Sequence, residues 1–244
     1  MKILNYPSLN FTAKKFRKIK YIIIHYTGMK SSFESLKRLC DKNSKVSCHY
    51  FINEAGKIMQ LVDDNNIAWH AGFSSWEKDI NLNKNSLGIE LQNKGDDFGY
   101  QRFSDKQIKS LIDILIVLKE KYLIKDCYIL AHSDIAPDRK IDPGYLFPWK
   151  KLYKKNLGLM PIIKNNSRLP IKIKEIKKTQ TLLSNYGYKI RKTGILDLQT
   201  ILVLNSFLSH FCQNKIKYFD YERSTIEALT SLIKEKNRCL TKKI

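Results

Sequence analysis

The sequence predicts an α/β fold, with a mixed central sheet flanked by helices and followed by a small three-helix module. Two observations predict it. Short β-branched runs alternate with segments of helical period up to residue 160, and only helical periods follow residue 173. With 244 residues, 43% of them hydrophobic, the chain is long enough for two units with their own cores. We therefore expect an α/β domain over 1–160, a linker over 161–173 and a helical domain over 174–244.

The first predicted elements follow one another closely. Residues 20–25 form a β-branched run that is typical of a buried strand, and residues 31–39 follow with the period of a helix that starts from a Ser cap. Residues 48–53 and 57–61 flank a turn at Gly56 and indicate a hairpin. Because a hairpin pairs antiparallel strands, the sheet should have mixed strand directions.

Two further short apolar runs, residues 86–91 and 127–131, read as strands. Between them, Ser104 and Gln107 form a capping box in front of an amphipathic helix. Beyond Leu157, a stretch with Gly, Pro, Asn and Ser residues marks the linker. Three segments after it have helical spacing: 174–185, 196–211 and 223–236.

Basic residues are in excess, with 44 Lys and Arg against 23 Asp and Glu, for a formal net charge of +21. Such a charge favours anionic partners, among them nucleic acid, anionic membrane and anionic cell-wall polymer. The basic residues are spread along the chain rather than clustered with exposed aromatic residues, so we expect no nucleic-acid partner. No stretch reaches the ~20 apolar residues of a membrane span, and we expect a monomer without one.

The five cysteines are odd in number and include no close pair, which argues against a disulfide framework and against a thiolate metal site. The first residues also lack the apolar run, about 7–15 residues long, that a secretory signal needs. Both features favour a cytoplasmic location. The periplasm or cell envelope, reached by a route that is not visible in the sequence, is the alternative.

Three side chains with the chemistry of zinc ligands stand at or beyond strand ends. His25 ends the first strand, His132 follows the 127–131 strand, and Asp142 comes shortly after it. Strand ends in α/β sheets project side chains into a common crevice. Two imidazoles and one carboxylate, with a fourth position open for water, are a ligand set of catalytic zinc. A histidine at a strand end is more often structural, so spacing alone leaves the metal role open.

Five blocks of the sequence, taken in order, resemble the type 2 N-acetylmuramoyl-L-alanine amidases, which are related to peptidoglycan recognition proteins and amidase-type phage lysozymes. The resemblance covers roughly residues 18–155. The blocks are Ile23-Ile24-His25-Tyr26-Thr27, Ser47-Cys48-His49-Tyr50-Phe51-Ile52 with the Gly56 turn, Ala68-Trp69-His70-Ala71-Gly72, Asn85-Ser86-Leu87-Gly88-Ile89-Glu90-Leu91, and residues 131–144.

The resemblance implies hydrolysis of the amide bond between N-acetylmuramic acid, or its 1,6-anhydro form, and L-alanine in peptidoglycan or muropeptide fragments. It implies one Zn²⁺ held by His25, His132 and Asp142. Zinc lowers the pKa of its bound water toward ~7, which makes hydroxide available at neutral pH. Glu90 is then the general acid/base that moves a proton to the departing nitrogen, and Lys140 stabilises the oxyanion.

Other residues of these blocks have weaker implications. Trp69 and His70 match the substrate-cleft segment and are predicted to contact sugar or peptide, although a packed core Trp is the alternative. His49 is expected to be a hydrogen-bonded core residue. Some relatives carry a catalytic Tyr at the position of Cys48; a thiol cannot replace it, so the acid/base work should rest on Glu90.

The tail resembles, more weakly, the three-helix peptidoglycan-binding module, through residues 181–188 and 194–200. A helical cap that only stabilises the first domain is the alternative. For the whole chain, the alternative function is a noncatalytic peptidoglycan-recognition protein of the same fold. Such proteins commonly lack a zinc ligand, and none is missing here. The sequence leaves open whether polymeric wall or anhydro-fragments are cut.

Overall fold

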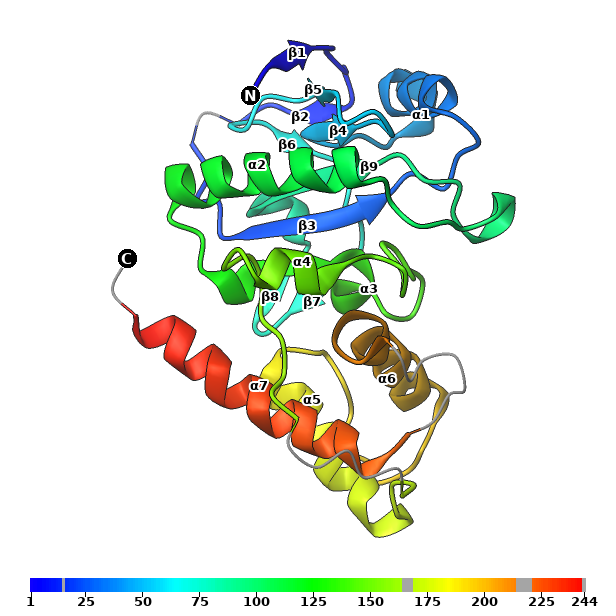
Figure 1. Ribbon diagram of the computed structural model, residues 1–244, viewed down its shortest axis with the longest axis vertical. Helices are drawn as coiled ribbons and strands as arrows, with labels where there is room; N and C mark the ends of the chain where they lie inside the picture. Colours follow the sequence, from blue (N-terminus) through cyan, green and yellow to red (C-terminus); the bar gives the residue numbers. More distant parts are fainter. Residues whose placement is uncertain (15, 164–168, 214–220, 243–244) are drawn as a thin grey trace.

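The computed structural model of the protein describes residues 1–14, 16–163, 169–213 and 221–242 (Figure 1). Its centre is a six-stranded sheet in the order β1-β5-β4-β9-β3-β10. These strands are β1 (Ile3–Asn5), β5 (Ile58–Gln60), β4 (Tyr50–Ile52), β9 (Ser86–Leu91), β3 (Tyr21–Tyr26) and β10 (Ile129–Ala131). Two small two-stranded sheets pair β2 (Phe11–Thr12) with β6 (Ile67–Ala68) and β7 (Ser75–Trp76) with β8 (Asp79–Ile80).

The sheet is mixed, as the hairpin predicted. β4 and β5 pair antiparallel, whereas β4, β9, β3 and β10 pair parallel to one another. β3 lies between two strands and is buried from Tyr21 to His25, which explains why its sequence is apolar almost throughout instead of alternating. Because parallel strands end at the same edge of a sheet, the carboxyl ends of β9, β3 and β10 meet.

The helices that the sequence predicts over 31–39 and after Ser104 are confirmed, whereas the two short helices that follow β10 were not predicted. Ser31 caps α1, and the Ser104 hydroxyl accepts a hydrogen bond from the Gln107 N–H at the start of α2, at 3.1 Å. The α-helices here are α1 (Ser32–Cys40), α2 (Asp105–Tyr122), α3 (His132–Ile135) and α4 (Trp149–Tyr153). Short 3-10 helices are η1 (Lys42–Ser44), η2 (Leu82–Lys84), η3 (Asp96–Phe98), η4 (Asp126–Tyr128) and, later, η5 (Ile173–Glu175).

Three C-terminal helices, α5 (Ile176–Tyr186), α6 (Leu198–Phe211) and α7 (Arg223–Thr241), lie together beyond β3 in the lower half of Figure 1. The predicted fold class is therefore confirmed. α7 continues past its predicted end at residue 236, because its last turns still pack on the first part. Cys239 is buried there, and its Sγ accepts a hydrogen bond from the Cys127 N–H at 3.4 Å. Among the described residues, no helix is both long and apolar enough to cross a bilayer.

The C-terminal helices share one hydrophobic core with the sheet. Trp76 of β7 is fully buried and packs edge-on against Tyr186 and Tyr188, with ring centroids 5.7 and 4.9 Å away. The domain limits at 1–160, 161–173 and 174–244 stay a prediction. Within the proposed linker, residues 164–168 lie outside the described part of the chain.

A buried carboxylate, Asp64, links β4 to the end of α2. Asp64 accepts hydrogen bonds from the hydroxyls of Tyr50 and Tyr122, both at 2.6 Å, and from the Lys121 ammonium at 3.0 Å. Burial alone would raise the pKa of Asp64, but these donors outweigh it and lower the pKa below its ordinary value. The ionised carboxylate therefore stabilises the fold.

We predict that Asp64→Asn lowers the free energy of unfolding by about 1–3 kcal/mol at pH 7, since buried donors lose their acceptor. The folded-state pKa of Asp64 is depressed, so its contribution is complete above the unfolded value near ~4 and is lost as the pH falls through the folded pKa. Urea unfolding at pH 7 and pH 3 should thus show a smaller deficit at pH 3. Asp113→Asn, on the exposed face of α2, is the control, and a deficit independent of pH would contradict this assignment.

Candidate active site

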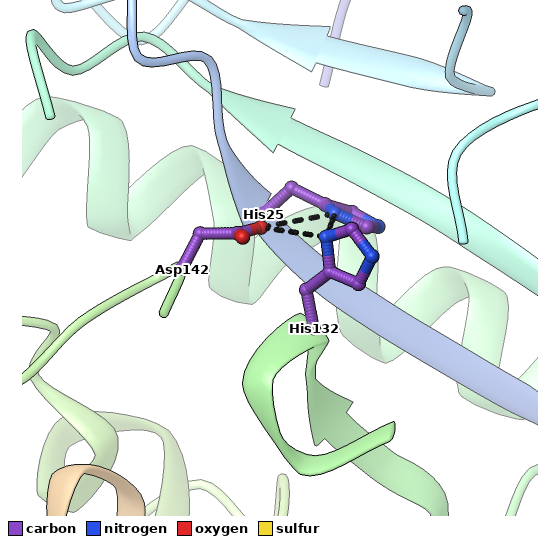
Figure 2. A group of neighbouring side chains, drawn as sticks. All are labelled: His25, His132 and Asp142. Carbon is purple, nitrogen blue, oxygen red and sulfur yellow. Dashed lines mark hydrogen bonds and ion pairs between the residues drawn. The ribbon is translucent and has the colours of Figure 1, made fainter. Parts of the chain in front are cut away.

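Three side chains from separate segments converge at the sheet edge where the parallel strands end (Figure 2). His25 stands near the end of β3, and His132 comes directly after β10. His132 thus follows the strand as predicted, and it is also the first residue of the short helix α3. Asp142 reaches in from the loop that follows, and Figure 2 shows its carboxylate pointing at both imidazoles.

The three ligand atoms are within hydrogen-bond distance of one another. His25 Nδ1 is 2.9 Å from His132 Nδ1 and 3.1 Å from Asp142 Oδ2, and the last two atoms are 3.0 Å apart. All three side chains are buried. Ligand atoms about 2.0–2.1 Å from a tetrahedral ion lie roughly 3.3 Å from one another. The spacing therefore fits a small metal ion between them.

The hydrogen bonds behind His25 set its tautomer. The Ser86 hydroxyl donates to the Leu82 carbonyl at 2.6 Å, so it accepts from His70 Nε2–H, 3.2 Å away. His70 Nδ1 is then left to accept from His25 Nε2–H, at 3.0 Å. The lone pair of His25 Nδ1 consequently points at the proposed ion, and a chain of this kind is what orients metal-bound imidazoles.

His132 is arranged in the same way. Its Nε2–H donates to the Ala71 carbonyl at 3.3 Å, which leaves Nδ1 unprotonated. Burial, helped by His132, lowers the pKa of His25 to about 4, so this imidazole is neutral at neutral pH. The Asp142 carboxylate faces both unprotonated nitrogens, with Oδ2 3.1 Å from His25 Nδ1 and 3.0 Å from His132 Nδ1. Two imidazole lone pairs and one anion facing each other fit a bound cation.

His70 lies against His25 because one residue of β9 has no side chain. A Cβ added at Gly88 would overlap the His70 ring. His70 is buried and also borders the pocket at the metal site, so its predicted contact with substrate stays a prediction. Its hydrogen bond with His25 Nε2 places His70 behind that metal ligand.

We predict that His70→Phe weakens metal binding by about 10–100-fold, because it removes the acceptor that orients His25. Ser86→Ala should weaken it less, since it removes only the end of the chain. Competition with a chromophoric chelator measures the affinity. The matched control is Ser110→Ala, whose hydroxyl also donates to a backbone carbonyl, that of Gly56 at 2.7 Å, but on α2. Unchanged affinity in His70→Phe would contradict the assigned tautomers.

The ligands open into a pocket of about 540 Å³ whose lining includes Glu90 and Lys140. Glu90 pairs in register with His25 across β9 and β3, so both side chains leave the sheet on the same face. Its Oε2 is buried, with no hydrogen-bond partner among the described residues. Burial, then the Asp142 carboxylate, raises the pKa of Glu90 to about 8, against an opposing effect of Lys140. A carboxyl poised near neutrality suits proton transfer.

Trp69 and Cys48, from the blocks matched in the sequence, are not among the residues that line this pocket. Trp69 is half-buried, donates its indole N–H to the Thr12 hydroxyl at 3.0 Å, and is absent from the pocket lining. Burial, then the nearby Glu90, raises the pKa of Cys48 well above its ordinary value, so this thiol is neutral. The expected core role of His49 agrees with its contacts, since its Nδ1 accepts from the Gly88 N–H at 3.0 Å.

Comparison with known proteins places the chain in a family. The N-acetylmuramoyl-L-alanine amidase family (Amidase_2) matches residues 15–145. The Escherichia coli (strain K12) N-acetylmuramoyl-L-alanine amidase AmiD is 35% identical over 214 residues, which cover 80% of this chain and 76% of AmiD. The chain belongs to the N-acetylmuramoyl-L-alanine amidase family.

Solved structures extend the likeness of this amidase to the C-terminal helices. The complex of E. coli AmiD with anhydro-N-acetylmuramic acid-L-Ala-D-γ-Glu-L-Lys superimposes with a TM-score of 0.78 at 30% identity, over 92% of both chains. Pseudomonas aeruginosa AmpDh3 gives the same TM-score at 27% identity, over 93% of this chain and 96% of that one. The 1,6-anhydro-N-acetylmuramyl-L-alanine amidase AmpD of Haemophilus influenzae is 39% identical over 109 residues, 44% of this chain and 56% of its own.

Proposed function

We propose that this amidase is a zinc enzyme that cleaves the bond between N-acetylmuramic acid, or its 1,6-anhydro form, and the L-alanine of a muropeptide. The observation that carries the metal is the convergence of His25, His132 and Asp142 with both imidazole tautomers set for binding. The substrate is supported by relatives, since AmiD and AmpDh3 have been solved with anhydromuramic peptides.

The ligand set favours zinc. Two imidazoles and one carboxylate suit Zn²⁺, and no thiolate joins them among the described residues. When bound, zinc supplies a Lewis acid and lowers the pKa of the water that attacks the amide.

We assign the proton transfers to Glu90. Glu90 borders the pocket beside the ligands, and its raised pKa lets the carboxyl gain and lose a proton near neutral pH. Glu90 takes a proton from the attacking water and gives it to the L-alanine nitrogen, which leaves only when it is protonated. This side chain therefore works first as a base and then as an acid.

Lys140 supplies positive charge to the same pocket. It is partly buried, and its charge is close enough to lower the pKa of both Glu90 and His25. The adjacent Arg139 also lines this pocket, but its guanidinium is engaged by the backbone carbonyls of Ala71 and Phe73. Lys140 is therefore the residue that we assign to stabilising negative charge on the amide oxygen during attack.

We predict that Glu90→Gln lowers kcat on an anhydro-muropeptide by about 10²–10⁴-fold, because the amide cannot accept or return the proton. Zinc content should stay at the wild-type level, since Glu90 is not a ligand. Glu54→Gln, an exposed carboxylate on the hairpin turn, is the control and should keep full activity. A fully active Glu90→Gln enzyme would show that another group carries the proton.

Lys140→Met should lower kcat by about 10²–10³-fold while KM changes little, because its charge stabilises the transition state more than the bound substrate. Steady-state kinetics on the same muropeptide separate the two constants. Lys109→Met, which removes an exposed charge from α2, controls for the loss of net charge. A rise in KM with kcat unchanged would make Lys140 a substrate-binding residue instead.

The cytoplasmic location stays a prediction. The preferred size of the substrate can be tested directly. Intact sacculi and anhydro-muropeptides, each incubated with the enzyme with and without chelator, distinguish wall cleavage from fragment cleavage. Product analysis should find free L-alanine-terminated peptides in the untreated samples alone. Cleavage that resists complete removal of the metal would contradict the proposed zinc chemistry.

A further inference from the structure

A fully buried carboxylate lies next to the metal ligands. Asp134 is on α3, two residues after His132, and only 1% of it is exposed. One oxygen accepts from the Ala131 N–H at 2.8 Å, so Asp134 closes the first turn of the helix that carries His132. None of the assigned catalytic steps uses this carboxylate.

The remaining hydrogen bonds to Asp134 come from the C-terminal helical part of the chain. Tyr188 donates its hydroxyl to Oδ1 at 2.6 Å, and Ser206 donates to the same oxygen at 3.3 Å. His210 of α6 lies with Nδ1 2.7 Å from Oδ2. Apart from one backbone N–H, every partner of Asp134 in the described part of the chain therefore belongs to residues 188–210.

These partners are themselves fixed by packing. Tyr188 is buried against Trp76, and the His210 ring stacks between Trp149 and Phe211, with centroids 3.7 and 3.8 Å away. A side chain held in one rotamer by aromatic packing is a rigid hydrogen-bond donor. The position of Asp134 thus depends on how the C-terminal helices pack against the first part of the chain.

The same short helix reaches two metal ligands. α3 begins with His132, and the N–H of Ser133, its second residue, donates to the Asp142 carbonyl at 3.0 Å. A shift of α3 would therefore move His132 directly and Asp142 through this bond, whereas His25 is held separately in the sheet. Metal sites tolerate displacements of only about 0.5 Å before binding suffers.

We propose that Asp134 is a positioning residue through which the C-terminal helices hold His132 and Asp142 in place for the metal. On this account the helical module completes the metal centre, whatever else it binds. The inference rests on the proposed metal site at His25, His132 and Asp142, and it assigns no role to Asp134 in the chemical step.

The test uses the full-length protein and measures zinc affinity by chelator competition. Tyr188→Phe removes one of the three side-chain donors to Asp134 and keeps the ring on Trp76, and His210→Phe removes a second while keeping the stack. Tyr221→Phe is the matched control, since its hydroxyl donates at 3.0 Å to Asn205 within the helical part. We expect about tenfold weaker zinc binding in each of the first two variants and wild-type affinity in the control. Lower kcat at unchanged KM should accompany the weaker binding.

Two results overturn the proposal. The first leaves the proposed zinc site in place, and the second rules out that site as well. If Tyr188→Phe and His210→Phe bind zinc as the wild type does and lose only thermal stability, Asp134 is purely structural and the zinc site stands. If the wild-type protein and Tyr221→Phe bind no zinc either, the proposed metal site itself fails. Asp134→Asn is a further variant. If that variant does not fold, Tyr188→Phe and His210→Phe still test the proposal.

Discussion

The meeting of three parallel strand ends at one edge of the sheet is the constraint on which the whole site depends. β9, β3 and β10 lie side by side, so Glu90, His25 and His132 emerge next to one another although they are far apart in sequence. Only Asp142 has to be brought in by a loop. The sheet thus places an acid/base group beside a ligand set, which is how α/β folds assemble sites.

Around this edge, the surrounding hydrogen bonds leave the ligand atoms free to bind. Each ring Nε2 finds a protein acceptor, His70 for His25 and Ala71 for His132, and each Nδ1 is left facing Asp142. Such an arrangement places two lone pairs and a negative charge in a buried pocket, which is unfavourable unless a cation joins them. A complete ligand set, beside a Glu90 whose Oε2 has no partner in the described part of the chain, also favours the catalyst over the noncatalytic receptor that the sequence left as an alternative.

Local sequence signals were sufficient for the longer elements, because β-branched runs, the Ser104 cap and the Gly56 turn act over a few residues, but they did not predict β1, β2, β6, β7, β8, α3 or α4. The ligand set needed the family resemblance, since a histidine at a strand end has no distinctive local pattern. Two features were beyond sequence reasoning. The contact of His70 with His25 depends on the missing side chain of Gly88 on another strand, and the bond from His210 to Asp134 joins residues that only tertiary packing brings together. Trp69, matched by motif, is not among the residues that line this pocket, and its contact with substrate stays a prediction.

X-ray absorption at the zinc edge of the purified, zinc-loaded protein identifies the atoms that bind the metal. We expect one zinc per chain with only nitrogen and oxygen neighbours near 2.0–2.1 Å, about two of them imidazoles. A sulfur neighbour at about 2.3 Å would place the metal on one of the cysteines instead, and a protein that retains no zinc would contradict the account altogether.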